Sequence, residues 1–280
     1  MAKAAAAGNA RFGDLRQRVL SGAGLAALAL GLLWLGGWWA AVLVAALAGA
    51  MAWEWRAMVR TPEPLASWEV LAPVLVFGAG VLLSQTHGFL AGLALLGAGL
   101  GALALIDLQA ERRTTALWTL AGGAYLGVAC LAFLALRGFE PFGFDAALWV
   151  VLVVVAADIG GYFAGRLIGG AKLWPAVSPK KTWAGLAGAV ALACLLGGLF
   201  SWATVGTYYQ QVCLVSGLAA LLAQAGDLAE SAAKRHFGLK DSSALIPGHG
   251  GVLDRCDGLV AATLAVAAAT AWRGQSVFIW

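Results

Sequence analysis

Nine long apolar stretches restrict what this chain can fold into. Each covers about 15–23 residues, close to the roughly 20 that a helix needs to cross a lipid bilayer. The stretches lie at 19–35, 37–53, 69–85, 88–106, 116–136, 146–168, 183–202, 208–226 and 258–272. A backbone inside lipid must satisfy its own hydrogen bonds, so stretches of this length predict helices. Because the first two are separated only around Gly36 and Gly37, they form either a tight hairpin or one bent element.

The composition excludes a soluble protein of this size. Apolar residues make up 61% of the 280 positions and charged residues only 11%, and the mean hydropathy is +0.84. Ordinary soluble domains carry about 25% charged residues. We therefore predict an all-α polytopic membrane protein with about nine transmembrane helices. The four cysteines form no CxxC pair, so neither a zinc site nor a disulfide framework is expected.

The distribution of basic residues predicts how the helices are oriented. With the N-terminus in the cytoplasm and nine crossings, every Lys and Arg except Arg137 and Arg273 falls in a cytoplasmic segment or an adjoining helix end. This is the pattern that the positive-inside bias requires. The polar segments 166–182 and 227–257 then both face the cytoplasm, where soluble nucleotides and metal ions are present.

The first polar motif, DIGGYFAGR from Asp158 to Arg166, closes the sixth apolar stretch. An ionisable residue inside a membrane span is costly, which makes Asp158 a candidate functional residue. The alternative is a structural ion pair, either with Arg166 or with another helix. The glycines of this region favour close approach of helices over phosphate binding. They are Gly160, Gly161, Gly165, Gly169 and Gly170.

The second motif, SPKKTW from Ser178 to Trp183, stands just before the seventh apolar stretch. Two lysines and a threonine at a helix start can bind phosphate through their charge and through free backbone N–H groups. A basic stop beside anionic lipid headgroups explains the motif equally well. The spacing alone leaves both interpretations open.

The third motif begins at GDLAES, from Gly226 to Ser231, and continues to Gly258. Asp227 and Glu230 are three residues apart and share a face if helical, and Asp254 and Asp257 repeat that spacing. Two carboxylate pairs around a cytoplasmic loop predict a Mg²⁺ site, because Mg²⁺ usually combines few carboxylates with substrate phosphates. Bases in the segment would bind phosphate oxygens; they are Lys234, Arg235, Lys240 and Arg255. A solvated basic loop is the alternative, but it does not account for four acids at the membrane edge.

The turn PGHGG, from Pro247 to Gly251, is rich enough in glycine for its backbone to approach a polyphosphate closely. The sequence contains no GxxxxGK[ST], HExxH or GxSxG motif, which argues against a Walker-type phosphate loop, a zincin and a serine hydrolase. We predict a metal-dependent enzyme that acts on phosphates at the cytoplasmic membrane surface. Residues 1–145 would form a transmembrane scaffold, and 146–280 the catalytic region.

These residues resemble the signature of the phosphatidate cytidylyltransferases, also called CDP-diacylglycerol synthases. Every fixed position of S-x-x-K-R-x-x-x-x-K-D-x-x-x-x-x-P-G-H-G-G-x-x-D-R-x-D is met between Ser231 and Asp257. The other motifs are similar to further motifs of that family, in its order. The resemblance is strong over about 155–258, whereas the N-terminal stretches match only in hydrophobic character. Three positions depart from the pattern: Ala184 replaces an acid, Ser243 a common Gly, and Gly258 a usual Ser.

The resemblance implies transfer of the cytidylyl group of CTP to phosphatidate, giving CDP-diacylglycerol and pyrophosphate for phospholipid biosynthesis. It implies Mg²⁺ as a cofactor and leaves a second metal ion open. The expected metal ligands are Asp227 and Asp254, supported by Asp257, Glu230 and, unless it anchors an ion pair, Asp158. Residues expected in catalysis are Asp227, Asp254, Asp257, Lys240, Asp241 and His249. Residues expected to bind CTP or lipid phosphate are Arg166, Ser178, Lys180, Lys181, Lys234, Arg235, Gly250, Gly251 and Arg255.

The expected partners are CTP, phosphatidate and membrane lipids, with a homodimer left open and no nucleic acid. The expected location is the inner (plasma) membrane of a bacterium, with the active site facing the cytoplasm. A CTP-dependent kinase of polyprenols or other lipid alcohols is an alternative. A membrane transporter is a rival of a different class, but it predicts charges near the bilayer midplane in both halves. Here the charges gather on one face of the C-terminal half.

Overall fold

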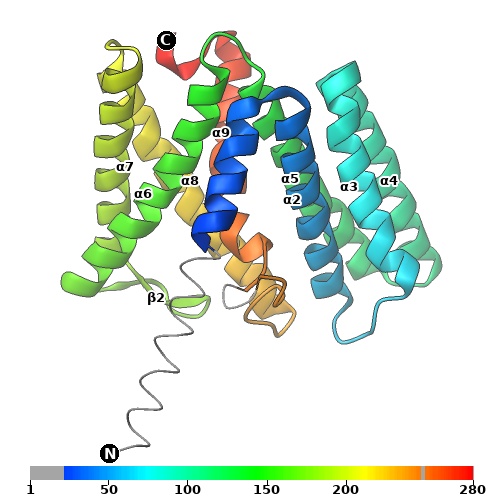
Figure 1. The fold of residues 1–280 in the computed structure, drawn as a ribbon. Coiled ribbons are helices and arrows are strands. Elements are labelled where there is room, and N and C mark those ends of the chain that lie inside the picture. Colours follow the sequence, from blue (N-terminus) through cyan, green and yellow to red (C-terminus); the bar gives the residue numbers. More distant parts are fainter. Residues whose placement is uncertain (1–21, 247–249, 280) are drawn as a thin grey trace, which may run out of the picture.

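The computed structural model describes residues 22–246 and 250–279, and these form a helical bundle (Figure 1). The helices are Gly22–Leu35, α2 (Gly37–Arg60), α3 (Ser67–His87), α4 (Phe89–Gln109), α5 (Arg113–Arg137), α6 (Gly143–Leu167), α7 (Trp183–Thr204), α8 (Tyr209–His236) and α9 (Leu253–Arg273). A short 3₁₀ helix, η1 (Val277–Ile279), follows. Seven of these helices, α2 to α8, are long and apolar enough to cross a membrane. The predicted all-α polytopic membrane fold is confirmed, while the exact number of spans stays a prediction.

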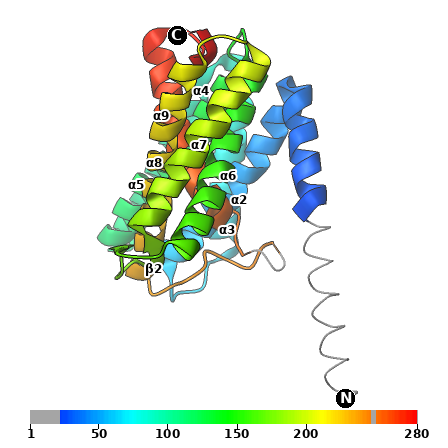
Figure 2. The same ribbon diagram turned by 90° about the vertical axis from the view of Figure 1, so that its left-hand side faces the viewer.

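The first two apolar stretches form a hairpin. The chain reverses direction between Gly22–Leu35 and α2 (Figure 1). Gly36 and Gly37 have φ angles of 69° and 49°, a conformation that side chains with a Cβ rarely adopt. Figure 2 shows the first helix leaning away from the rest of the bundle. Of the two arrangements that the sequence left open, the structure has the hairpin.

The loops that carry the polar motifs lie at one end of the bundle. Figure 1 shows the connections after α6 and after α8 together at one end of the bundle, whereas the end of α9 and η1 lie at the opposite end. Successive helices therefore run in alternating directions, in agreement with the predicted order of crossings. The side of the membrane on which this end lies stays a prediction.

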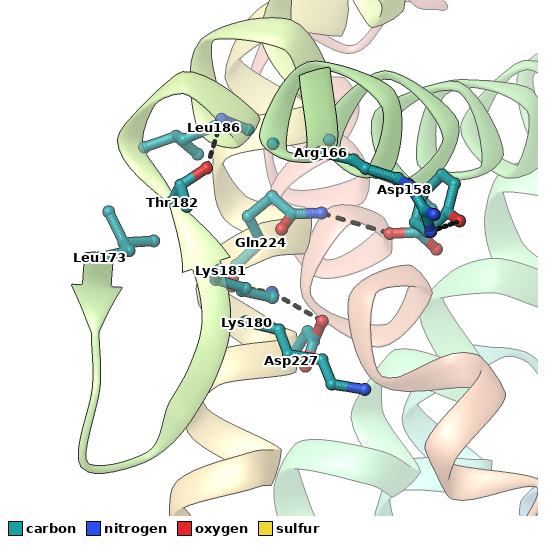
Figure 3. A pocket seen from close by; sticks show the side chains of 13 residues that line it. Asp158, Arg166, Leu173, Lys180, Lys181, Thr182, Leu186, Gln224 and Asp227 are labelled. Atoms are coloured by element: carbon teal, nitrogen blue, oxygen red, sulfur yellow. Dashed lines mark hydrogen bonds and ion pairs between the residues drawn. The ribbon is translucent and has the colours of Figure 1, made fainter. Parts of the chain in front are cut away.

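A short β-hairpin interrupts the helices where the sequence predicted only a polar loop. Strands β1 (Lys172–Trp174) and β2 (Ser178–Thr182) pair antiparallel, with Lys172 opposite Thr182. Gly169 and Gly170, with φ angles of 68° and 89°, turn the chain out of α6 just before this hairpin. The hairpin places SPKKTW beside the ends of α6 and α8 (Figure 3).

Glycines bring α6 and α7 into close contact. A Cβ on Gly160 would collide with the carbonyl of Gly188, and one on Gly188 would lie 2.7 Å from the carbonyl oxygen of Gly160. Gly161 packs in the same way on Gly185, where a Cβ would lie 3.0 Å from the Gly161 carbonyl oxygen. The predicted role of these glycines in close helix approach is therefore confirmed. Gly169 and Gly170 differ, because they serve the turn into β1.

The buried core joins the two halves of the chain at the site. One apolar cluster is built mainly from the helices before Arg137 but also contains Val252 and Leu253, at the start of α9. A second cluster lies among α6 to α9 and includes Trp149, whose indole N–H donates to Ser216 at 3.0 Å. The end of the signature segment is thus packed against the N-terminal half. The predicted division at residue 145 stays a prediction.

Candidate active site

A polar cavity of about 480 Å³ opens among α6, the β-hairpin, α7 and α8. Five of its lining residues carry a charge; they are Asp158, Arg166, Lys180, Lys181 and Asp227. All five were predicted from the sequence, and they come from three motifs that lie up to 69 positions apart, from Asp158 to Asp227. Figure 3 shows them converging from α6, β2 and α8.

A chain of polar contacts links the three motifs across this cavity. The Lys181 Nζ lies 2.6 Å from Asp227 Oδ2 and donates to the carbonyl oxygen of Gln224 at 3.4 Å. The Gln224 side chain in turn donates to Asp158 Oδ1 at 3.2 Å (Figure 3). Asp158 does not pair with Arg166, whose guanidinium instead donates to the Tyr162 hydroxyl at 3.0 Å. The carboxylate of Asp158 is exposed to the cavity, which leaves it accessible to a ligand.

The start of α7 faces the same cavity. Thr182 is the residue before the helix, and its hydroxyl accepts the N–H of Gly185 at 3.0 Å. Thr182, Gly185 and Leu186 line the cavity together. The free N–H groups and partial positive charge of a helix start favour an anion there. Lys180 and Lys181 add positive charge beside it, and of the two interpretations of this motif, phosphate binding stays a prediction.

Two acids of the third motif, Glu230 and Asp254, face Lys234. Its ammonium group lies 2.6 Å from Glu230 Oε2 and 2.5 Å from Asp254 Oδ1. Asp254 also accepts the N–H groups of Ser242 and Gly251, each at 3.0 Å. Burial disfavours the charge of Asp254, but these hydrogen bonds, with that from Lys234 the largest among them, lower its pKa to about 2. Asp254 therefore ties the loop after α8 to the start of α9.

Glu54 on α2 is a residue of this site that the sequence reasoning missed. It is fully buried, and it accepts the N–H groups of Val252 at 2.9 Å and Leu253 at 2.6 Å. It also accepts the hydroxyls of Ser242 at 3.2 Å and Ser243 at 2.5 Å. A carboxylate at a helix start satisfies free N–H groups and complements the helix dipole. Glu54 directly follows the predicted apolar stretch 37–53, and an acid next to such a stretch was the signal that could have found it.

Asp257 lies one turn further into α9. Its Oδ1 accepts its neighbour's N–H, that of Gly258, at 2.7 Å. Its carboxylate interacts electrostatically with both Asp227 and Asp158. It also lines a smaller cavity of about 200 Å³, together with Glu230 and Tyr125. Asp257 therefore stands between the polar cavity and the Lys234 cluster.

The other predicted residues are distributed around these two groups. Arg235 donates to the carbonyl oxygen of Leu239 at 2.7 Å, and Lys240 and Asp241 are exposed on the loop that follows. Arg255 is exposed and acts electrostatically on Asp158. Ser178 is half-buried at the start of β2. His249 lies outside the described residues.

The glycines of the signature loop have a packing role in this structure. Gly250 has a φ of 86°, and its carbonyl oxygen accepts the N–H of Ile246 at 2.9 Å. A Cβ on Gly251 would collide with the Ser242 hydroxyl and lie 2.7 Å from Glu54 Oε1. The N–H of Gly251 is bound to Asp254. Ile246 and Gly250 are thus paired with each other, and phosphate binding by the backbone of PGHGG stays a prediction.

The oxygen ligands present fit one mode of Mg²⁺ binding. Among residues 22–246 and 250–279, no three or more His, Cys, Asp or Glu side chains are grouped to hold a metal ion by themselves. Asp158 and Asp227 nevertheless line one cavity, with Asp257 within electrostatic range of both. Mg²⁺ commonly binds through one or two carboxylates plus substrate phosphates. The cavity suits that mode, because basic groups for phosphate line it beside the acids.

Comparison with known proteins identifies the class. A cavity with acids, lysines and a helix start suits the binding of phosphates. The model of the cytidylyltransferase family matches residues 16–272. The chain is 38% identical over 249 residues to the phosphatidate cytidylyltransferase of Brucella suis biovar 1 (strain 1330), which covers 89% of this chain and 90% of that protein.

Shorter matches agree. The phosphatidate cytidylyltransferases of Bacillus subtilis (strain 168) and Helicobacter pylori (strain ATCC 700392 / 26695) are 38% and 39% identical over 134 and 154 residues. These matches cover 48% and 53% of this chain, and 50% and 58% of the two relatives. The chain belongs to the cytidylyltransferase family. The resemblance seen in its sequence motifs is therefore confirmed over nearly the whole chain.

The structure shows contacts that account for two of the three departures from the family pattern. Ser243 uses its hydroxyl to bind Glu54, which a glycine there would not do. Gly258 is buried, and a Cβ on it would lie 3.3 Å from the carbonyl oxygen of Ala223 on α8. Gly258 thus permits close packing of α9 on α8. Nothing in the structure explains Ala184.

Proposed function

We propose that the protein transfers the cytidylyl group of CTP to phosphatidate, producing CDP-diacylglycerol and pyrophosphate. The observation that carries the proposal is the cavity in which Asp158, Lys181 and Asp227 meet at the end of membrane-spanning helices. A polar cavity in that position gives a soluble nucleotide and a lipid phosphate access to the same groups. The relatives named phosphatidate cytidylyltransferase support this choice of substrates.

In the proposed reaction, a phosphate oxygen of phosphatidate attacks the α-phosphorus of CTP. A new P–O bond forms, and the bond from the α-phosphorus to the bridging oxygen breaks, so that pyrophosphate leaves with the bonding electron pair. The lipid phosphate is already ionised near neutral pH, so a strong general base is not required. Positioning of the two phosphates and neutralisation of their charge therefore account for most of the rate.

Each group of residues has a distinct role in this proposal. Asp158 and Asp227, with Asp257, hold Mg²⁺, which supplies charge neutralisation at the polyphosphate when bound. Lys180, Lys181 and the start of α7 bind phosphate oxygens, and Arg166 and Arg255 provide further positive charge near the cavity. Lys234, Glu230 and Asp254 keep the signature loop folded, so their effect on catalysis is positional. A direct metal contact by Asp254 remains the alternative from the sequence pattern.

The orientation and assembly belong to the same proposal. The N-terminus and the polar cavity face the cytoplasm, where CTP is available, and the membrane is the bacterial inner membrane. All nine helices cross it or dip into it. A homodimer is compatible with this arrangement.

The test is a direct assay of the purified protein in detergent or lipid nanodiscs. CTP, Mg²⁺ and phosphatidate are expected to give CDP-diacylglycerol and pyrophosphate in equal amounts, and chelation of Mg²⁺ is expected to stop the reaction. ATP in place of CTP serves as the nucleotide control. Absence of CDP-diacylglycerol, together with CTP-dependent phosphorylation of a polyprenol, would overturn the proposal in favour of a lipid kinase.

A further inference from the structure

A second cavity, entirely apolar in character, lies next to the polar one. It has a volume of about 400 Å³ and lies between the hairpin Gly22–Leu35/α2 on one side and α5, α6 and α9 on the other. Its lining includes Leu30, Val44, Phe133, Val151 and Leu259. Among the lining residues that belong to the described part of the chain, Thr263 carries the only hydroxyl. The first helix, which leans away from the bundle in Figure 2, forms its outer wall.

One face of α6 runs from this apolar cleft directly into the polar cavity. Leu148, Val151, Leu152 and Val155 line the cleft, and their spacing of three and four residues places them on one face of the helix. Asp158, three residues beyond Val155, lines the polar cavity. Three residues of a helix correspond to a rise of about 4.5 Å. The change from an apolar to a charged lining therefore occurs within a single helical turn.

Helix α9 repeats this change of character. Cys256 and Leu259 line the apolar cleft. Asp257, between them in sequence, interacts electrostatically with Asp158 and Asp227 of the polar cavity, and the charge of Arg255 also acts on Asp158. Two helices from different parts of the chain thus place an apolar surface and a charged surface side by side.

The apolar cleft is accessible rather than sealed. Leu152 and Val155 are 40% and 47% exposed, although they face the cleft between packed helices. An apolar surface of this kind in a membrane protein is filled by something apolar, either bulk lipid, another helix or a bound acyl chain. The polar cavity beside it selects among these, because its lysines and its helix start favour an anionic group. An anionic lipid with a phosphate headgroup has both parts in the required order.

We propose that the apolar cleft is a binding subsite for an acyl chain of the phosphatidate substrate, whose phosphate occupies the polar cavity. The proposal rests on the proposed function for the identity of the lipid. The lipid enters from the bilayer beside the first helix, with its headgroup towards Asp158 and its chain along α6 towards Leu148. The cleft then contributes to the affinity for long-chain phosphatidate and makes no contribution to the affinity for CTP.

A kinetic experiment on the full-length protein tests the subsite. Val151→Trp and Leu259→Trp each fill the cleft with a large side chain, and Leu199→Trp on α7 is the matched control, since Leu199 is 49% exposed and does not line the cleft. The two cleft variants are expected to raise the KM for dioleoyl phosphatidate about tenfold, because the larger side chain takes the space that the acyl chain would occupy. The KM for CTP and for dihexanoyl phosphatidate should stay at the wild-type value. An equal effect on both lipids, or none on either, contradicts the subsite.

Labelling with a photoreactive lipid tests the subsite without turnover. Phosphatidate carrying a diazirine at the end of one acyl chain should label α6 and α9 peptides in the wild-type protein and lose that labelling in Val151→Trp. Excess dioleoyl phosphatidate should compete, whereas dioleoyl phosphatidylcholine should not. Equal competition by phosphatidylcholine means that the cleft holds bulk lipid, and a cross-link between two protein copies means that it holds a helix; either result overturns the proposal. If labelling succeeds while no CDP-diacylglycerol forms, the proposed function fails and the subsite stands.

Discussion

Two groups of charged side chains lie near the same end of the bundle and have opposite surroundings. The first, a closed network, links the four helices α2, α3, α4 and α5. Arg56 on α2 binds Asp107 on α4 at 2.5 and 2.8 Å and Thr119 on α5 at 2.9 Å. Glu69 on α3 binds Arg56 at 3.2 Å and also pairs with Arg60. Arg56 is 2% exposed and Asp107 is fully buried. Every charge in it meets a protein partner, and its side chains are almost fully buried.

The second group, an open cluster, consists of Asp158, Lys181 and Asp227. Its ion pair is 2.6 Å long, comparable with those of the closed network, but the side chains of Lys181 and Asp227 are 18% and 30% exposed. They border a cavity of about 480 Å³. The comparison shows that an ionisable residue in a membrane span identifies a site only where the partners leave room for a ligand. The surroundings of a charged side chain, and not its charge alone, distinguish a structural ion pair from a candidate site residue.

Breaking the closed network should give the largest effect on stability. In Arg56→Met, Asp107 loses its partner and remains as a buried charge, a loss that typically costs about 3–5 kcal/mol. Thermal unfolding of the purified protein in detergent measures the change. The control is Arg112→Met, since Arg112 pairs with Glu63 where both are well exposed, and exposed pairs contribute about 0–1 kcal/mol. Equal melting temperatures for the two variants would contradict the structural role.

Breaking the open cluster should instead affect the reaction. Asp227→Asn is expected to lower kcat by about 10²–10³-fold, the range observed when one preorganised electrostatic contact is removed. The melting temperature should change little, because the carboxylate is partly exposed. Asp145→Asn, in the first turn of α6 at the opposite end, is the matched control and should keep wild-type activity. A variant Asp227→Asn that retains full Mg²⁺-dependent turnover would exclude Asp227 from the cation site.

Glu54 on α2 holds the start of α9 and should show an intermediate effect. Glu54→Gln removes the charge that receives the N–H groups of Val252 and Leu253, which is expected to cost about 1–3 kcal/mol of local stability. Hydrogen exchange at these two amides should accelerate, and kcat/KM for CTP should fall while the rest of the bundle keeps its protection. Glu63→Gln, at a side chain 55% exposed, provides the comparison. Unchanged exchange at both amides would show that Glu54 does not hold the loop.

The smallest effect is expected at Ser243. Ser243→Gly restores the residue common in the family and removes one hydrogen bond to Glu54, which typically contributes about 0.5–1.5 kcal/mol. A small decrease in melting temperature with activity within twofold of wild type is therefore expected. Ala244→Gly, at the next position, controls for the added backbone freedom. If the two variants have the same stability, the Ser243 hydroxyl contributes nothing measurable.

Much of the fold was predictable because its signals are local. The length of an apolar stretch sets its ability to cross a bilayer, and each of the nine predicted stretches contains or overlaps an observed helix. The glycine contacts of α6 and α7 were predictable for a similar reason, since close packing in lipid needs small residues. The β-hairpin at Lys172–Thr182 was not predicted, because its strands are short and carry no clear alternation of apolar and polar residues.

The candidate site was predictable in its members but not in their partners. Asp158, Lys181 and Asp227 were selected from spacing and from the cost of charge in a membrane, and the structure brings them to one cavity. Asp254 and Glu230 were selected in the same way, yet they face Lys234. Glu54 was missed although it directly follows the predicted apolar stretch 37–53. Spacing identifies residues that share a helix face, but it carries no information on contacts between helices.

The sequence by itself determined that this is a helical membrane protein with a cytidylyltransferase signature, because hydrophobic length and motif spacing are properties of the chain. Only the tertiary structure decided which charged residues belong to the closed network and which to the open cluster, since that depends on how the helices pack. The contact of Glu54 with Leu253 spans 199 positions, and the junction of the apolar cleft with the polar cavity requires α6 and α9 to lie side by side. A buried charge needs a partner because burial without one is costly, and the packing of the helices decides which residue that partner is.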